Sequence, residues 1–118
     1  MIIPCTLDPA GHIAVVRPVG ELDIATADAL RDALARACSG EADTVVVDLA
    51  AVTFVDSSVI GLLVATAKQL RRGGCHLLIV NATSRPMRTL QLTGAPSVVD
   101  VRPLGAQLDP EVAACLSA

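Results

Sequence analysis

The segment VTFVDSSVIGLLV, residues 52–64, changes character in its middle. It is mostly apolar up to Val55, and from Ser57 onward its apolar residues continue in a pattern typical of a helix. Asp56, Ser57 and Ser58 stand between these parts as three consecutive polar residues. Asp and Ser are favoured at helix N-caps, because their side chains accept hydrogen bonds from backbone N–H groups that otherwise lack partners. The segment therefore predicts the N-terminus of a largely buried helix.

Patterns typical of buried strands lie on both sides of this helix. Residues 44–49 (TVVVDL) and 75–80 (CHLLIV) are continuous aliphatic runs, which are typical of central strands covered on both faces. The helix between them spans residues 57–72 and is followed by Gly73, after two arginines that suit a helix C-terminus.

The N-terminal part of the chain predicts a β-hairpin followed by a helix. Apolar runs at 2–7 and 12–19 flank a turn rich in Pro and Gly, which favours a hairpin. Residues 27–37 repeat apolar side chains at helical spacing, and either Asp23 or Thr26 is suited to cap that helix.

The C-terminal part predicts a helix over 85–93 closed by Gly94, a strand over 97–101, and a terminal helix. Asp109 and Pro110 suit the N-cap and first position of that last helix. The alternation predicts an α/β fold, with a mixed sheet of about five strands flanked by about four α-helices. We expect one domain over residues 1–118.

Composition excludes several classes of function. The chain is 53% apolar but 1% aromatic, and its net charge is −3. It has neither a dense basic patch nor aromatics for base stacking, which disfavours nucleic-acid binding. No apolar run approaches the roughly twenty residues of a membrane-spanning helix, and no signal peptide is evident. We therefore expect a cytoplasmic protein without direct membrane insertion.

The cysteines predict neither a metal site nor a cofactor. Cys5, Cys38, Cys75 and Cys115 show no CxxC spacing, and the two histidines are too scattered to complete a ligand set. Two interpretations remain for them. They are small packing side chains, or Cys75 and Cys115 form a redox pair if the fold brings their elements together.

The polar cluster at 56–58 also has two interpretations. A helix cap explains one of its three residues well, but it requires neither the second serine nor the apolar residues before it. A serine hydroxyl at a helix N-terminus is also a good phosphate acceptor, because the free N–H groups and the helix dipole favour an anion there. The spacing alone leaves both interpretations open.

Three stretches resemble one family. Gly20–Asp23 (GELD) with Thr26-Ala27, residues 45–64 (VVVDLAAVTFVDSSVIGLLV) and residues 81–101 (NATSRPMRTLQLTGAPSVVDV) resemble, in unbroken order, motifs of STAS domains. The resemblance is strongest to the anti-sigma factor antagonists of bacteria, and it covers nearly the whole chain.

The resemblance implies a phosphorylation switch. Ser57 takes the phosphoacceptor position, with Ser58 as the second choice and Asp56 as the acidic neighbour. The partner is an anti-sigma factor that is also a serine kinase with a GHKL-type fold. The unphosphorylated form binds this partner and frees the sigma factor, and a PP2C-type phosphatase restores it after phosphorylation. The implied partner-binding residues are Glu21, Asp23, Thr26, Asp56, Ser57, Ser58 and Ser84.

The chain departs from the family pattern at Val59, where the family usually has Gly directly after the second serine. The side chain reduces backbone freedom there, so we expect slower phosphorylation. Gly61 remains inside the predicted helix, where Gly costs about 1 kcal/mol relative to Ala. That cost predicts tight packing around Gly61.

Two other functions compete with the switch. An enzyme is disfavoured, because the chain lacks a nucleophile elbow, a Gly-rich phosphate loop and a Cys/His set. Asp48 stands at a strand end like the phosphoacceptor of a receiver domain, but the acidic pair and lysine of receivers are missing. The alternative is a STAS subunit of a lipid-transport or other membrane-associated assembly, without a phosphorylation switch; Val59 slightly favours it.

Overall fold

The computed structural model describes residues 2–117. Its strands are β1 (Cys5–Leu7), β2 (Ile13–Val16), β3 (Gly20–Leu22), β4 (Thr44–Asp48), β5 (Val52–Val55), β6 (His76–Ala82) and β7 (Asp100–Pro103). Its α-helices are α1 (Ala27–Cys38), α2 (Ser57–Arg72), α3 (Ser84–Leu92) and α4 (Pro110–Ser117), and a 3-10 turn, η1, spans Ala95–Ser97.

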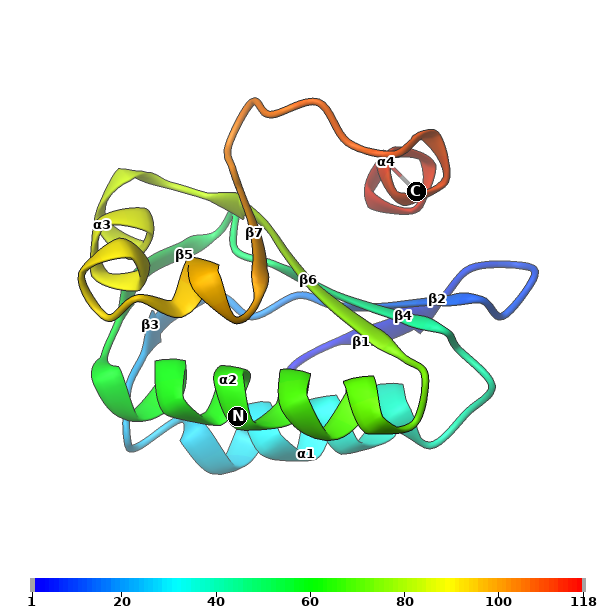
Figure 1. The fold of residues 1–118 in the computed structure, drawn as a ribbon, viewed down its shortest axis with the longest axis horizontal. Coiled ribbons are helices and arrows are strands. Elements are labelled where there is room, and N and C mark those ends of the chain that lie inside the picture. The colour runs from blue at the N-terminus through cyan, green and yellow to red at the C-terminus, as the bar shows by residue number, and fades with distance from the viewer. Residues whose placement is uncertain (1, 118) are drawn as a thin grey trace.

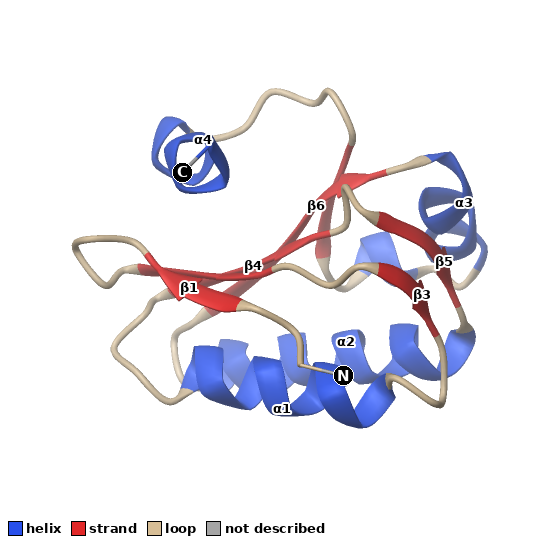
Figure 2. Cartoon of the chain, turned by 180° about the vertical axis from the view of Figure 1, so that it is seen from behind, coloured by secondary structure: helices blue, strands red, loops and turns tan. Residues whose placement is uncertain are grey.

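The main sheet has five strands in the order β1-β2-β4-β6-β7. β1 is antiparallel to β2, and the other neighbours are parallel. Helices α1 and α2 lie side by side against one face, whereas α4 lies alone over the other (Figure 1, and from behind in Figure 2). The expected mixed sheet of five strands with four α-helices is confirmed.

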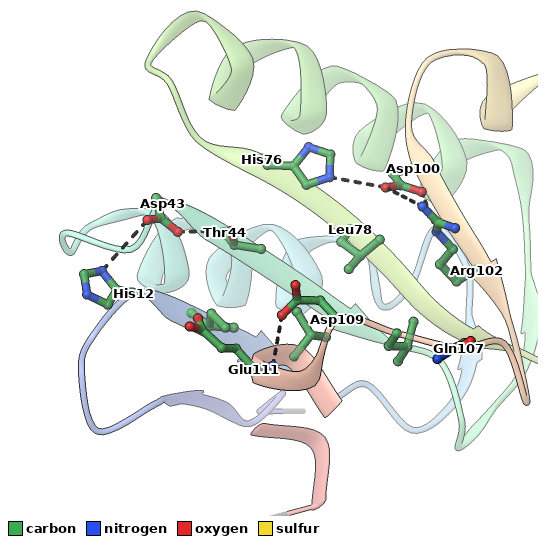
Figure 3. Close-up of a pocket in the computed structure, with 13 residues that line it drawn as sticks. His12, Asp43, Thr44, His76, Leu78, Asp100, Arg102, Gln107, Asp109 and Glu111 are labelled. Atoms are coloured by element: carbon green, nitrogen blue, oxygen red, sulfur yellow. Dashed lines mark hydrogen bonds and ion pairs between the residues drawn. The ribbon is translucent and has the colours of Figure 1, made fainter. Parts of the chain in front are cut away.

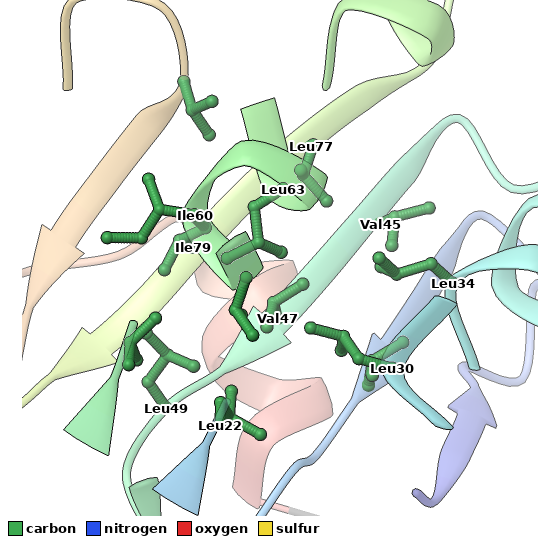
Figure 4. Close-up of a cluster of buried hydrophobic side chains, with 14 of the residues drawn as sticks. Leu22, Leu30, Leu34, Val45, Val47, Leu49, Ile60, Leu63, Leu77 and Ile79 are labelled. Carbon is green, nitrogen blue, oxygen red and sulfur yellow. The ribbon is translucent and has the colours of Figure 1, made fainter. Parts of the chain in front are cut away.

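Alternation along the central strands builds two apolar layers. Val45 and Val47 of β4 face α1 and α2, where they join a large cluster with Leu30 and Leu63 (Figure 4). Val46 points to the opposite face and joins a smaller cluster beneath α4. All three valines are fully buried, as expected for a continuous β-branched run.

A second, two-stranded sheet was not predicted. β3 and β5 pair in parallel, with Glu21 beside Phe54 and Leu22 beside Val55. Each strand is only three or four residues long, so neither shows enough alternation to be recognised alone. This small sheet carries the chain directly into α2.

The last strand was predicted too early. Residues 97–101 were expected to form it, but β7 begins at Asp100. Gly94 adopts φ 77 after α3, and the N–H groups of Val98 and Val99 both donate to the carbonyl of Ala95. These bonds commit the residues before Asp100 to a turn.

Asp48 is the one charged residue among residues 2–117 that is buried. Its Oδ2 accepts from Arg17 at 3.0 Å, and its Oδ1 accepts from the Asn81 side chain and the Ala50 N–H, each at 3.0 Å. Asn81 itself has φ 59, a left-handed conformation that asparagine tolerates better than most residues. Arg17 also donates to two carbonyls near the end of α4. Asp48 therefore joins β4, β6 and α4.

Candidate functional site

Asp56 is the N-cap of α2 and joins three elements. Its Oδ1 accepts from the Val59 N–H at 3.0 Å and from the Ser58 hydroxyl at 2.6 Å. Its Oδ2 accepts from the Ile24 N–H at 3.1 Å, and its own N–H donates to Leu22 at 3.0 Å. One carboxylate thus caps the helix and fastens the loop between β3 and α1 to it.

These donors favour the ionised carboxylate of Asp56. The Ser58 hydroxyl contributes most to lowering the pKa of Asp56, followed by the Val59 N–H, against a smaller opposing effect of burial. Asp56 therefore carries a negative charge next to Ser57 at neutral pH.

The structure distinguishes the two serines. Both are exposed, but the Ser58 hydroxyl is engaged by Asp56 whereas the Ser57 hydroxyl makes no hydrogen bond within residues 2–117. Ser57 is also the first residue of α2, where backbone N–H groups lack helical partners. Of the two serines, Ser57 therefore has the free hydroxyl.

Val59 does not cover this surface. Its side chain is fully buried in the cluster beneath α1 and α2. The valine therefore contributes to the core, and the exposed face around Ser57 stays open to a partner.

The expected tight packing at Gly61 is wrong. A Cβ atom built on Gly61 would meet nothing within 4 Å, and the residue is exposed. Gly61 lies one helical turn after Ser57, so both residues occupy the same face of α2. The glycine leaves a shallow, open surface beside Ser57.

Gly61→Ala is expected to stabilise the free protein by about 0.5–1 kcal/mol, because alanine has the higher helix propensity and meets no neighbour. Urea denaturation of the variant measures this gain. A loss of stability would show that the glycine is required by the fold. Gly40→Ala, outside any helix and also in open space, is the control for unfolded-state effects.

Asp23 and Thr26 shape the loop that Asp56 holds. Asp23 Oδ1 accepts from the N–H groups of Ala25 and Thr26 at 3.0 and 3.2 Å. The Thr26 hydroxyl oxygen accepts from the Asp23 N–H at 2.9 Å. Thr26 is the N-cap of α1, but its side chain makes no capping bond to the helix. The two predicted caps therefore fold the loop rather than the helix end.

Asp23→Ala is expected to lower the free energy of unfolding by about 1 kcal/mol, because it removes the acceptor of two loop N–H groups. Asp23→Asn keeps an acceptor oxygen and is expected to stay within about 0.5 kcal/mol of wild type. Parallel urea denaturation of both variants measures the difference. Equal stabilities would mean that the loop does not depend on this side chain.

Ile24 is a candidate partner contact that the sequence reasoning missed. It is 78% exposed, although it is a large apolar side chain. Its backbone is fixed by the bond to Asp56, which places it next to the start of α2. The signal was a large apolar residue in the short segment Ile24-Ala25-Thr26 between the GELD motif and the first helix.

Glu21 and Ser84 lie at the same end of the molecule but outside the Asp56 network. Glu21 is exposed on β3, and Ser84 is exposed at the first position of α3. Figure 1 places α3, the small sheet and the start of α2 together at one end. The Cζ atom of Arg85, on α3, lies 6.0 Å from the centroid of the Phe54 ring, on β5. No hydrogen bond joins Ser84 to Ser57 within the described part of the chain.

The structure does not bring Cys75 and Cys115 together. Cys75 packs against the large cluster beneath α1 and α2, and Cys115 against the smaller cluster beneath α4, on the opposite face of the sheet. All four cysteines are free. Cys75 instead shares a surface cavity with Cys38, near the C-terminal ends of α1 and α2.

A polar cavity of about 510 Å³ lies on the α4 side of the sheet (Figure 3). In it His12 faces Asp43 at 3.9 Å, and His76 faces Asp100 at 3.5 Å. Residues 2–117 contain no group of three side chains placed to hold a metal ion. None of the helices in this range is long and apolar enough to cross a membrane.

The chain is similar to known proteins over most of its length. A family model of the STAS domain matches residues 6–112. The anti-sigma-B factor antagonist of Bacillus subtilis (strain 168) is 30% identical over 86 residues, covering 73% of this chain and 78% of the relative. An anti-sigma factor antagonist from Mycobacterium paratuberculosis has a crystal structure with a TM-score of 0.76 at 28% identity, covering 95% of this chain and 92% of that one.

SpoIIAA from Bacillus has the same fold in two states. Its unphosphorylated form has a TM-score of 0.71 at 19% identity, covering 98% of each chain. Its phosphorylated form has a TM-score of 0.66 at 21% identity, covering 98% of this chain and 99% of that one.

Proposed function

Since this chain belongs to the STAS domain family, we propose that it is an anti-sigma factor antagonist. It acts by binding: the unphosphorylated chain engages an anti-sigma factor through the start of α2 and the adjoining loop, and thereby frees a sigma factor. The names of its relatives support this role.

One observation carries the proposal. A free, exposed serine hydroxyl at the N-terminus of α2 lies beside an exposed apolar side chain, and Asp56 holds both segments together. A phosphate placed in an apolar interface or next to a carboxylate disrupts it, so this arrangement suits an interface that phosphorylation switches off.

Electrostatics give the switch its direction. Phosphorylation of Ser57 adds a charge of about −1.5 to −2 at pH 7, next to the ionised Asp56. A partner that covers this surface would have to desolvate both charges, which is costly unless it supplies compensating groups. Phosphorylation is therefore expected to weaken binding.

The partner is proposed to be the kinase as well. A GHKL-type anti-sigma factor with bound ATP would dock on the loop carrying Ile24 and Asp23 and transfer phosphate to Ser57. A PP2C-type phosphatase would remove it. The buried Val59 leaves the acceptor accessible, which supports phosphorylation in spite of the departure from the family pattern.

Binding to an anti-sigma factor tests the function directly. A purified complex of a GHKL-type anti-sigma factor with its sigma factor, from the same organism, is titrated with the unphosphorylated chain. The account predicts release of the sigma factor and a new complex containing this chain, resolved by size-exclusion chromatography. If every such complex of the organism stays intact, the proposed function is wrong.

The alternative is a subunit of a lipid-transport or other membrane-associated assembly without a phosphorylation switch. Val59 slightly favours it, because a valine reduces backbone freedom directly after Ser58, but the side chain is buried and leaves the surface around Ser57 open. Recovery of a membrane-bound transport ATPase instead of an anti-sigma factor in a pull-down would support it.

A further inference from the structure

An apolar groove lies between the β1–β2 hairpin and α4, on the face of the sheet away from the Ser57 site. Its volume is about 530 Å³, within the range of about 300–1,000 Å³ typical of small-molecule sites. Leu7 and Val15 line it from the hairpin, and Ala114 and Cys115 from α4. Leu7 is 60% exposed although it belongs to the edge strand of the sheet. The hairpin and α4 lie near each other in both overall views (Figures 1 and 2).

The groove exists because α4 covers the sheet only in part. Val112 is the one residue of α4 that is buried, among residues 110–117. The guanidinium of Arg17 binds the C-terminal end of the helix, because it donates to the backbone carbonyls of Cys115 and Leu116 at 3.1 and 3.3 Å. The helix is therefore anchored at its C-terminal end while apolar surface of the hairpin stays open beside it.

The charges around the groove are unequal. Asp8 and Glu111 both line it. Asp8 uses one carboxylate oxygen to accept from the Ile13 N–H at 3.0 Å, and the Glu111 carboxylate forms no ion pair within residues 2–117. The positive charge of Arg17 is paired with Asp48 at 3.0 Å. Arg17 also lines the groove, but its charge is balanced by Asp48, so Asp8 and Glu111 leave the groove with an excess of negative charge.

The thiol of Cys115 is affected by both of these carboxylates. Its pKa is raised first by burial and then by Asp8 and Glu111, against a smaller opposing effect of Arg17. The effects of Asp8 and Glu111 show that both carboxylates act on the groove at Cys115, in addition to the larger effect of burial.

We propose that this groove binds a small primary aliphatic amine from solution. The alkyl chain packs against Leu7, Val15 and Ala114, and the ammonium group lies near the carboxylates of Asp8 and Glu111. Neither the family membership nor the proposed switch assigns a ligand here, and the site lies away from Ser57.

Three ligands with the same alkyl chain test the proposal. n-Octylammonium, 1-octanol and octanoate, each below the concentration at which it aggregates, are titrated into the isotope-labelled protein and followed by two-dimensional NMR. Octylammonium is expected to shift the amide signals of Leu7, Val15 and Ala114, with a dissociation constant at least about tenfold below that of octanoate. Equal affinities for the amine and the acid would overturn the proposal, as would shifts confined to other parts of the chain or no shifts at all.

Matched variants locate the ligand. Glu111→Gln and Asp8→Asn, which keeps an acceptor for Ile13, are each expected to weaken octylammonium binding about threefold or more while leaving 1-octanol binding unchanged. Glu41→Gln removes a distant exposed carboxylate and should change neither. Ala114→Leu should fill the groove and abolish binding, whereas Ala113→Leu, on the same helix but outside the groove lining, should not. Identical effects of the two leucine variants would contradict the assignment.

Discussion

Replacing Ile24 by aspartate is expected to lower the affinity of the chain for its anti-sigma factor by at least about a hundredfold. The side chain is 78% exposed and contributes nothing to the core, yet its backbone is fixed by Asp56. A large apolar side chain on a rigid loop is well suited to anchor an interface, because little conformational freedom is lost on binding. An aspartate there would place a third carboxylate beside those of Asp56 and Asp23.

Isothermal titration calorimetry with the purified partner measures the change. Ile2→Asp is the matched control, since Ile2 is 87% exposed but lies on the N-terminal segment. The control should bind like wild type, and both variants should keep the wild-type free energy of unfolding. Wild-type affinity of the Ile24 variant would mean that the partner does not contact this loop.

The second large effect is on stability. Asp48→Ala is expected to lower the free energy of unfolding by about 3 kcal/mol. The substitution removes the acceptor of Arg17, Asn81 and the Ala50 N–H together, and it leaves a largely covered guanidinium without its charge partner. Asn81 would in addition lose the bond that accompanies its left-handed backbone.

Urea denaturation measures this loss, with Asp43→Ala as the control. Asp43 also lies next to β4, but its side chain is 66% exposed, so we expect a change within about 0.5 kcal/mol. If the two variants lose equal stability, the Asp48 network does not hold the fold together. The same variant also tests a receiver-like role for Asp48. If folded Asp48→Ala still accepts phosphate from the partner kinase and ATP, Asp48 is not the phosphoacceptor.

The central layers of the fold could be predicted because their signal is long and periodic. Residues 44–49 read as a strand buried on both faces, and β4 has Val45, Val46 and Val47 buried in two different clusters. The small sheet could not be predicted in the same way. β3 and β5 are defined by each other, through pairs such as Leu22 with Val55, and neither has a pattern of its own.

The site was predicted in part for the same kind of reason. The N-cap chemistry of Asp56 and the position of Ser57 follow from local sequence, and the structure places both as expected at the start of α2. The bond from Ile24 to Asp56 spans 32 positions and has no local signature. The inward direction of the Val59 side chain depends on how α2 packs, so the sequence alone could not show that the surface around Ser57 is left open.

The redox pair shows the limit of arguing from element order alone. Cys75 and Cys115 belong to elements that could have been neighbours, but the sheet lies between them. Which face a crossover helix covers is decided by the handedness of the connection and by the side chains beneath it. The pairing of cysteines across a sheet therefore requires the structure.

Phosphate transfer to Ser57 tests the central claim most directly. The wild-type chain, Ser57→Ala and Ser58→Ala are incubated with the partner kinase and ATP, and the products are measured by intact-protein mass spectrometry and then by affinity for the same partner. The account predicts one added phosphate on the wild type and on Ser58→Ala, none on Ser57→Ala, and a loss of partner binding only in the phosphorylated chains. Phosphorylation of Ser57→Ala, or undiminished binding of the phosphorylated wild type, would contradict it.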